Sequence, residues 1–288
     1  MVAMTTLQSR SFPLLFVLLW STGFIGARLG IPHIEPLSFL SIRYLAVIVC
    51  MTGIAIVTRA PWPSKPQAWF HMGVSGLLIH GLYLGGVFIA IHQGLPAGVT
   101  SLVVSVQPLL TAIGAGYLLG NVVVKRQWGG LALGLVGVSL VVAGKLGTEF
   151  SAHALMPAGV ALLAITAGTL YQKRFCPTLD WRTGSVAQFI PTLLVTGALA
   201  LVTENQVIYW NGELLFAIGW LVLVLSIGAV SLLNWLIRHS NAVNVASLFY
   251  LVPPCTAVFA WLLFGETFSG LALLGMALTV AGVYLARK

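Results

Sequence analysis

ELLFAIGWLVLVLSIGAVSLLNWLI, residues 213–237, decides the fold class because it is an apolar run with a single charged residue, Glu213, at its start. A helix needs about 20 mostly apolar residues to cross a bilayer. Nine further segments meet this condition, with approximate limits 12–31, 36–58, 68–91, 97–119, 127–145, 155–174, 181–203, 242–264 and 269–286. The sequence therefore predicts an all-α integral membrane protein with ten transmembrane helices.

The composition also indicates a lipid environment. Of the 288 residues, 59% are hydrophobic and 7% are charged, and the mean hydropathy is +1.00. A soluble domain has about 25% charged residues and would have to expose these apolar side chains to water, whereas a bilayer accepts them. The net charge of +8 does not indicate nucleic acid, because the basic residues are scattered between apolar runs. We expect the lipid bilayer, and no nucleic acid, as a partner.

The three cysteines, Cys50, Cys176 and Cys255, are far apart and lack CxxC spacing. We therefore expect no disulfide, no metal site and no cofactor. The apolar stretch after Arg10 runs on to Gly30 without a clear small-residue cleavage site. This pattern predicts a retained first helix rather than a removed signal peptide.

The basic residues predict the orientation in the membrane. Cytoplasmic loops hold the excess of lysine and arginine. Eleven of the fourteen fall on the side of the predicted helices that holds the N-terminus: Arg10, Arg59, Lys65, Lys125, Arg126, Lys173, Arg174, Arg182, Arg238, Arg287 and Lys288. Only Arg28 and Lys145 fall on the far side, and Arg43 lies within a predicted helix. We expect a multi-pass protein of the cell inner membrane with both termini in the cytoplasm.

The chain repeats itself at about 145 residues. Gly120-Asn121, Gly130 and Gly137 recur as Gly265-Glu266, Gly275 and Gly282, and with a slip of one residue Ser101 and Pro108 recur as Ser247 and Pro254. Chance matching among frequent glycines is the alternative. Five helices per half is an odd number, so the two halves would cross the membrane in opposite directions. We predict two inverted five-helix repeats, 1–147 and 148–288, around a central cavity.

At these residues the sequence resembles the drug/metabolite transporter superfamily, specifically its bacterial EamA type. The resemblance covers nearly the whole chain and rests on four stretches: Trp20-Ser21-Thr22-Gly23-Phe24, Arg43-Tyr44, Pro108 with its downstream glycines, and Leu251-Val252-Pro253-Pro254 through Phe264-Gly265-Glu266-Thr267. The first repeat departs from the pattern, with Gly120-Asn121 where an acid is often found. In detail the chain is most similar to the YddG-type exporters of aromatic amino acids, on overall similarity and on His80.

The resemblance implies a small-molecule substrate that is exported from the cytoplasm through the central cavity. Amino acids, aromatic ones above all, are the expected substrates. Cationic drugs such as methyl viologen, or other metabolites of the superfamily, are the alternative.

Two ionisable residues within predicted spans are candidate pathway residues. His80 lies near the centre of segment 68–91 with Tyr83 on the same helix face, and its imidazole can hydrogen-bond a substrate or exchange a proton. A histidine bonded to a neighbouring helix is the alternative. Arg43 lies about 10 Å from the outer end of its helix. It is either a counter-charge for a substrate carboxylate or for an outer gate, or a structural arginine bonded to carbonyls.

Other polar and aromatic residues within the spans complete the expected lining: Trp20, Gln107, Tyr171, Gln188, Asn234 and Tyr250. Rings can stack on flat substrates and amides can bind an amino acid backbone, although packing explains each residue equally well. Pro108, Pro253 and Pro254 remove backbone donors within predicted spans, so we expect them to bend helices 97–119 and 242–264 for gating or for packing. Glycine pairs such as Gly130 and Gly134 predict closely packed helices.

All six acidic residues fall at or beyond the ends of the predicted spans. A carboxylate-driven antiport therefore has no obvious carrier, which leaves export down the solute gradient or histidine-coupled exchange. A channel would need a ring of like groups, usually from several subunits, whereas this chain carries an internal repeat. The chain contains no HExxH, GxSxG or phosphate-binding loop motif of an enzyme. We expect a monomeric transporter and not an enzyme.

Overall fold

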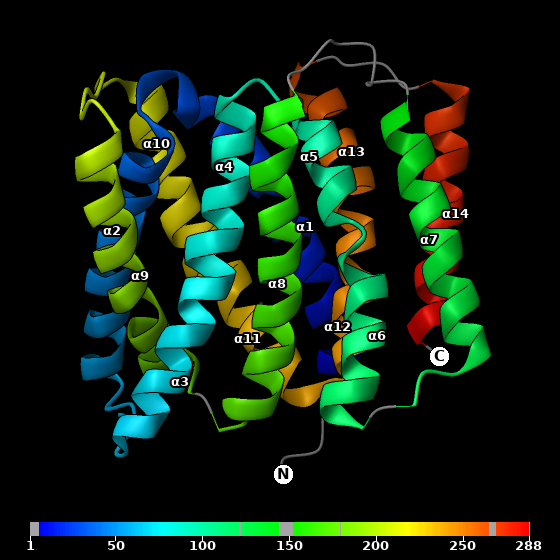
Figure 1. Ribbon diagram of the computed structural model, residues 1–288, viewed down its shortest axis with the longest axis horizontal. Helices are drawn as coiled ribbons and strands as arrows, with labels where there is room; N and C mark the ends of the chain where they lie inside the picture. The colour runs from blue at the N-terminus through cyan, green and yellow to red at the C-terminus, as the bar shows by residue number, and fades with distance from the viewer. Residues whose placement is uncertain (1–5, 121, 144–151, 179, 265–268, 288) are drawn as a thin grey trace.

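Apolar segments of this length fold as helices because only helices and closed barrels satisfy every backbone polar group inside lipid. The computed structural model describes residues 6–120, 122–143, 152–178, 180–264 and 269–287. Within these residues ten helical segments are long and apolar enough to cross a membrane, which confirms the predicted fold class (Figure 1). The β pairing in the same residues is limited to an isolated bridge between Ile34 and Ile208.

Six of the described spans contain one long α-helix each. They are α1 (Thr6–Gly30, extended by the 3-10 turn η1, Ile31–His33), α2 (Pro36–Val57), α7 (Lys125–Ala143), α8 (Leu155–Phe175, preceded by η3, Ala152–Ala154), α9 (Trp181–Thr203) and α14 (Gly270–Arg287).

The other four spans are interrupted near their middle. They are α3 (Pro66–Gly76), η2 (Leu77–Leu84) and α4 (Gly85–His92); α5 (Ala97–Val104) and α6 (Gln107–Leu119); α10 (Gly212–Trp220), η4 (Leu221–Ala229) and α11 (Val230–His239); and α12 (Ala242–Ser247), η5 (Leu248–Leu251) and α13 (Val252–Phe264). The segments η2 and η4 are π-helices, and η5 is a 3-10 turn.

Successive spans alternate in direction, so that α1 begins and α14 ends at the same end of the bundle, the lower end in Figure 1. Most basic residues in the described loops and helix ends belong to this end: Arg59, Lys65, Lys125, Arg126, Lys173, Arg174, Arg182, Arg238 and Arg287. Arg28, near the opposite end of α1, is an exception. Lys145 and Lys288 lie outside the described residues. Glu35, Glu204 and Glu213 lie at the opposite end, and Glu149 and Glu266 are outside the described residues.

Several helix starts and the interruptions recur at an offset of about 145 residues. The starts of α2 and α9 (36 and 181), of α6 and α13 (107 and 252) and of α7 and α14 (125 and 270) each differ by 145 residues. The π-helices η2 and η4 begin 144 residues apart, at 77 and 221. The structure thus repeats its irregularities with the period found in the sequence. The predicted Gly265-Glu266 motif lies outside the described residues.

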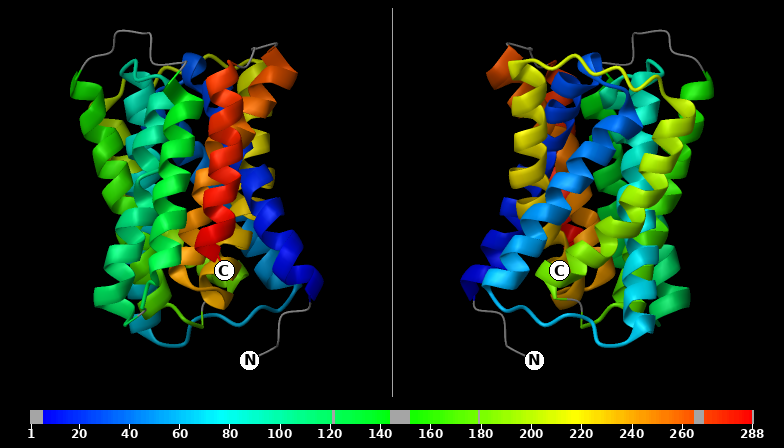
Figure 2. Two further views of the ribbon diagram at one scale, coloured as in Figure 1. Left: turned by 90° about the vertical axis from the view of Figure 1, so that its right-hand side faces the viewer. Right: turned by 90° about the vertical axis from the view of Figure 1, so that its left-hand side faces the viewer.

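Two closely packed helix pairs join elements that are related by this offset: α2 with α9, and α7 with α14 (Figures 1 and 2). In the second pair, a Cβ added to Gly282 would lie 2.4 Å from the nitrogen of Gly134 and 2.7 Å from the carbonyl of Gly130. Such contact is possible only because the facing residues are small. Gly130 and Gly134 therefore pack as their spacing predicted.

The prolines in the interrupted spans begin helices instead of bending them. Pro108 lies in the first turn of α6, directly after the break at Ser105 and Val106. Pro253 and Pro254 lie in the first turn of α13, after η5. The spans thus change course at helix breaks beside these prolines, because the N–H groups of a first turn have no acceptor within the helix and proline is favoured there.

Candidate functional site

Two aromatic rings stack in the interior of the bundle. Trp20 of α1 and Tyr83 of η2 have ring centroids 6.4 Å apart and planes at 10°, and both side chains are buried. Each ring lines two separate small cavities, so the pair forms a wall that both cavities share. Tyr83 sits in a π-helical turn, a feature that is frequent at functional sites. The structure therefore brings together two of the residues predicted to line the pathway.

The first cavity contains a charged group. Its volume is about 20 Å³, which is room for a water molecule. Besides Trp20 and Tyr83, its walls include Arg43 of α2, Ala27 of α1 and the ring of Phe88 of α4. An arginine therefore faces a mostly apolar and aromatic cavity.

The guanidinium of Arg43 is fully buried and only partly bonded. Its Nε donates to Oγ of Ser226 in η4 at 2.9 Å, whereas Nη1 and Nη2 have no hydrogen-bond partner among the described residues. No ion pair joins Arg43 to any acidic residue that the structure describes. The neighbouring Tyr44 donates from its hydroxyl to the carbonyl of His80 at 2.7 Å. Arg43 therefore presents two donors and an uncompensated positive charge to its surroundings.

The second cavity lies at the helix breaks. Its volume is about 10 Å³, and it is lined by Trp20, Tyr83, Ser101, Val104, Ser105, Phe249, Val252 and Pro253. Ser105 directly follows the last residue of α5, and its hydroxyl donates to the carbonyl of Ser101 at 2.6 Å. The hydroxyl oxygen of Ser21 in α1 lies 2.7 Å from the carbonyl oxygen of Val17 and 3.3 Å from that of Val252, so it can donate to one of them at a time. The two interrupted spans thus supply polar groups and Pro253 beside the stacked rings.

A separate polar network fills the space between α3, α8, α9 and α11. Gln172 donates to Asn234 at 2.9 Å, Asn234 to Gln188 at 3.3 Å, and Gln188 to Gln172 at 3.1 Å. Ser75 donates to Gln172 at 2.9 Å and accepts from Gln188 at 3.2 Å. Gln188 and Asn234 were predicted to line the pathway, but the structure places them in this buried network, and neither lines the two cavities.

His80 lies close to the candidate site without lining either cavity. Its buried ring stacks on Phe189 of α9, with centroids 4.2 Å apart and planes at 17°. Neither ring nitrogen has a well-formed hydrogen bond in the described part of the chain, and Gln188 is close by. The imidazole thus belongs to the packing between η2 and α9 in this arrangement.

The remaining predicted lining residues lie elsewhere. Gln107 and Tyr250 are fully buried, and the Gln107 amide and the Tyr250 hydroxyl have no partner within the described residues. The Tyr250 ring rests on Gly134, where an added Cβ would lie 2.7 Å from it. Tyr171 is near the lower end of α8, where its hydroxyl bonds Nδ1 of His71 at 2.7 Å. Pro108 and Pro254 do not line the two cavities.

Sequence reasoning missed several residues of the site. Ser226, Ala27 and Phe249 are single small or apolar residues within apolar runs, so neither composition nor periodicity distinguishes them from packing residues. Ser101 matches Ser247 in the repeat, but this match does not indicate that it lines a cavity. The offset of 145 residues is the signal that could have directed attention to Ala27, since it pairs this alanine with the polar residue Gln172.

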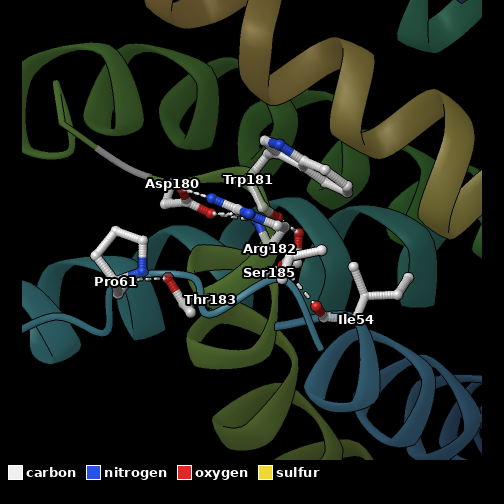
Figure 3. Close-up of polar contacts among 8 residues, drawn as sticks. Ile54, Pro61, Asp180, Trp181, Arg182, Thr183 and Ser185 are labelled. Carbon is white, nitrogen blue, oxygen red and sulfur yellow. Dashed lines mark hydrogen bonds and ion pairs between the residues drawn. The ribbon is translucent and has the colours of Figure 1, made fainter. Parts of the chain in front are cut away.

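The lower end of α9 is fixed by polar contacts (Figure 3). Asp180 accepts from the backbone N–H of Arg182 at 2.9 Å and from its guanidinium at 2.9 and 3.1 Å. Thr183 donates to the carbonyl of Pro61 at 2.7 Å, which ties α9 to the connection between α2 and α3. Partial burial opposes ionisation of Asp180, but its bonds to Arg182 outweigh this effect and hold the pKa of Asp180 below its ordinary value.

Comparison with known proteins adds to this geometry. The EamA-like transporter family matches the chain twice, over residues 11–143 and 150–287. The "Uncharacterized inner membrane transporter YedA" of Escherichia coli K12 is 25% identical over 281 residues, which cover 95% of this chain and 89% of that protein. The "Probable amino-acid metabolite efflux pump" of Salmonella typhimurium LT2 is 25% identical over 286 residues, covering 94% and 92%. A crystal structure with 19% sequence identity shares the fold, with a TM-score of 0.79 over 96% of this chain and 94% of its own.

Proposed function

The chain belongs to the EamA-like transporter family, and from this premise we propose that it exports amino acids from the cytoplasm by alternating access. Aromatic amino acids and other small amphipathic solutes are the proposed substrates. The two moving parts are the five-helix halves 1–147 and 148–288, inserted in opposite directions. Membership of a transporter family agrees with the expectation that the chain is not an enzyme.

The observation that carries this proposal is the Trp20–Tyr83 stack between two buried cavities. Cavities of about 20 and 10 Å³ are smaller than an amino acid, so a solute can pass only when the two rings separate. Stacked rings that part can also receive a flat side chain between them. A pathway that opens by moving aromatic side chains suits a carrier better than a permanently open pore.

The interrupted spans support movement of one half against the other. The break between α5 and α6 and the turn η5 between α12 and α13 lie at equivalent places in the 145-residue period, and both supply residues to the second cavity. Helix termini at such breaks are positions where backbone angles can change without loss of the neighbouring helices. Discontinuous helices at the interface of two repeats are typical substrate sites in transporters.

Location and direction follow from charge and from relatives. The basic residues at the lower end of the bundle favour the cytoplasm for that end, which contains the start of α1 and the end of α14. One relative is named an inner membrane transporter and another an amino-acid metabolite efflux pump. We propose the same membrane and solute class for this chain, which acts as a monomer.

Flux measurements in liposomes test the proposal. Purified protein is reconstituted, and release of labelled phenylalanine, of other amino acids and of methyl viologen is compared with protein-free liposomes. Saturable amino acid flux with counterflow is expected. No amino acid flux above the protein-free level overturns the proposal, flux of methyl viologen alone favours a drug exporter, and flux that stays linear in concentration favours a pore.

A matched pair of variants tests the site. Tyr83→Ala removes half of the stack and is expected to reduce amino acid flux. Leu82→Ala changes the adjacent residue of the same π-helix, which is 51% exposed on the outer surface, and is expected to leave the flux unchanged. Equal amino acid fluxes in the two variants would show that the Trp20–Tyr83 stack is not part of the transport pathway.

A further inference from the structure

Arg43 combines burial, an anchored orientation and two donors that no described residue accepts from. Its Nε is held by Ser226 at 2.9 Å, so the planar guanidinium cannot rotate freely. The two outer nitrogens have no partner among the described residues, and the side chain is one wall of the first cavity. A buried charge without a partner is strongly unfavourable, so such an arrangement persists only where something compensates it.

The positions in the second half that follow Arg43 and Ala27 by 145 residues hold polar side chains that hydrogen-bond one another. Gln188 follows Arg43 by 145 residues, and Gln172 follows Ala27 by 145 residues. Gln188 and Gln172 bond each other at 3.1 Å within the buried amide network. In the first half, the small side chain of Ala27 stands where Gln172 would be, and the cavity remains beside Arg43.

The difference between the halves concerns one pair of positions. In the second half Gln188 donates to Gln172, Gln172 donates to Asn234, and Asn234 donates back to Gln188, so each amide both donates and accepts within the network. In the first half the pair is an arginine and an alanine, which cannot satisfy each other. The unpaired donors of Arg43 and the space beside Ala27 therefore occur together.

We propose that Nη1 and Nη2 of Arg43 bind the carboxylate of the transported solute. A guanidinium matches a carboxylate with two parallel hydrogen bonds, and the low dielectric of the interior strengthens them. Trp20 and Tyr83 line the same cavity and contact the apolar part of the solute. This inference rests on the proposed function and narrows it: a carboxylate is required, and cations without one, such as methyl viologen, are rejected by the charge of Arg43.

Thermal unfolding of the purified full chain in detergent micelles tests binding without transport. The probes are 3-phenylpropionate, which has the carboxylate alone, and phenethylammonium, which has the amine alone. We expect 3-phenylpropionate to raise the Tm and phenethylammonium to leave it unchanged. Equal shifts with both probes, or no shift with 3-phenylpropionate, would overturn the proposal.

Variants on both sides of the cavity test the assignment to Arg43. Arg43→Met is expected to weaken 3-phenylpropionate binding by about tenfold or more, and Arg43→Lys by less, because an ammonium keeps the charge without the fork. Ala27→Gln supplies the amide found in the second half. Without ligand, the Ala27→Gln variant is expected to have the Tm of the wild type or a higher one. Addition of 3-phenylpropionate is expected to leave that Tm unchanged, so this variant tests carboxylate binding at Arg43 even where Arg43→Met does not fold.

The matched control is Gln172→Ala, which opens the equivalent place in the second half. It is expected to lower the Tm and to keep the response to 3-phenylpropionate. A full response in Arg43→Met or in Ala27→Gln would overturn the assignment.

The experiments distinguish failure of the export proposal from failure of the carboxylate site at Arg43. If liposomes show no amino acid flux while 3-phenylpropionate binds through Arg43, the export proposal is wrong and the anion site stands. If amino acids are exported, but phenethylammonium is exported equally well and Arg43→Met leaves their ratio unchanged, export stands and the anion site is wrong.

Discussion

Replacing Gly130 by alanine is expected to loosen α7 from α14, while the same change at the adjacent Gly129 is not. A Cβ on Gly130 would lie 2.5 Å from the nitrogen of Ala286 and 2.7 Å from the carbonyl of Gly282. Both are backbone atoms, so no rotamer change relieves the clash. Non-bonded heavy atoms rest at about 3.5 Å or more, so the helices must separate locally by about 1 Å. Overpacking of this kind costs about 1–3 kcal/mol.

Gly129 is the control because it lies in the same helix, α7, and is also replaced by alanine. Nothing lies within 4 Å of a Cβ at Gly129, so its expected effect is within about 0.5 kcal/mol. Any gain in helix propensity is common to both variants, and their difference reports the contact alone. The measurement is the free energy of unfolding in one detergent for the wild type and both variants. Equal stabilities for Gly129→Ala and Gly130→Ala would refute the reasoning.

Three further changes have defined outcomes. Ser226→Ala removes the anchor of Arg43 and is expected to raise the half-saturation concentration for amino acid efflux by about tenfold with little change in maximal rate; an unchanged value would contradict a positioning role. Gln188→Leu leaves its network partners unsatisfied and is expected to lower the free energy of unfolding by about 1–3 kcal/mol, so wild-type stability would count against the network. Asp180→Ala removes the cap of α9 and is expected to cost about 0.5–2 kcal/mol near neutral pH, and Asp180→Asn less. Because the pKa of Asp180 is below its ordinary value of 3.8 in the folded chain, this contribution is present above about pH 4 and is lost as the pH falls further. The stabilities of wild type and Asp180→Ala should therefore converge at acid pH, and a constant difference would argue against the ion pair.

The spans could be predicted from the sequence because crossing a bilayer is a property of local composition and length. The segment predicted at 181–203 is found as α9, Trp181–Thr203, and the segment predicted at 36–58 as α2, Pro36–Val57. The interruptions could not be predicted in the same way. The π-helix η2 has the same apolar composition as a regular helix, and the carbonyl of His80 within it accepts a bond from Tyr44 of another helix, a contact that no local pattern shows.

The candidate site was predicted only in part, because the residue types are visible in the sequence but their partners on other helices are not. Trp20, Tyr83 and Arg43 do meet at one cavity, as expected of large or charged residues within spans. Gln188 and Asn234 bond each other instead. A sequence shows that an amide is buried, but whether it turns toward a substrate or toward another amide depends on which residue faces it from a different helix. That information is not local in the chain.

The two seams, α2 with α9 and α7 with α14, have a consequence for how this interior can change. Each seam joins helices from the same place in the 145-residue period, which is the isologous contact of a two-fold dimer. In an assembly of two identical chains, every substitution would occur twice, once on each side of the axis. In one continuous chain a substitution affects one half only. The second half can therefore fill its interior with hydrogen-bonded amides while the first half has a guanidinium beside a small cavity.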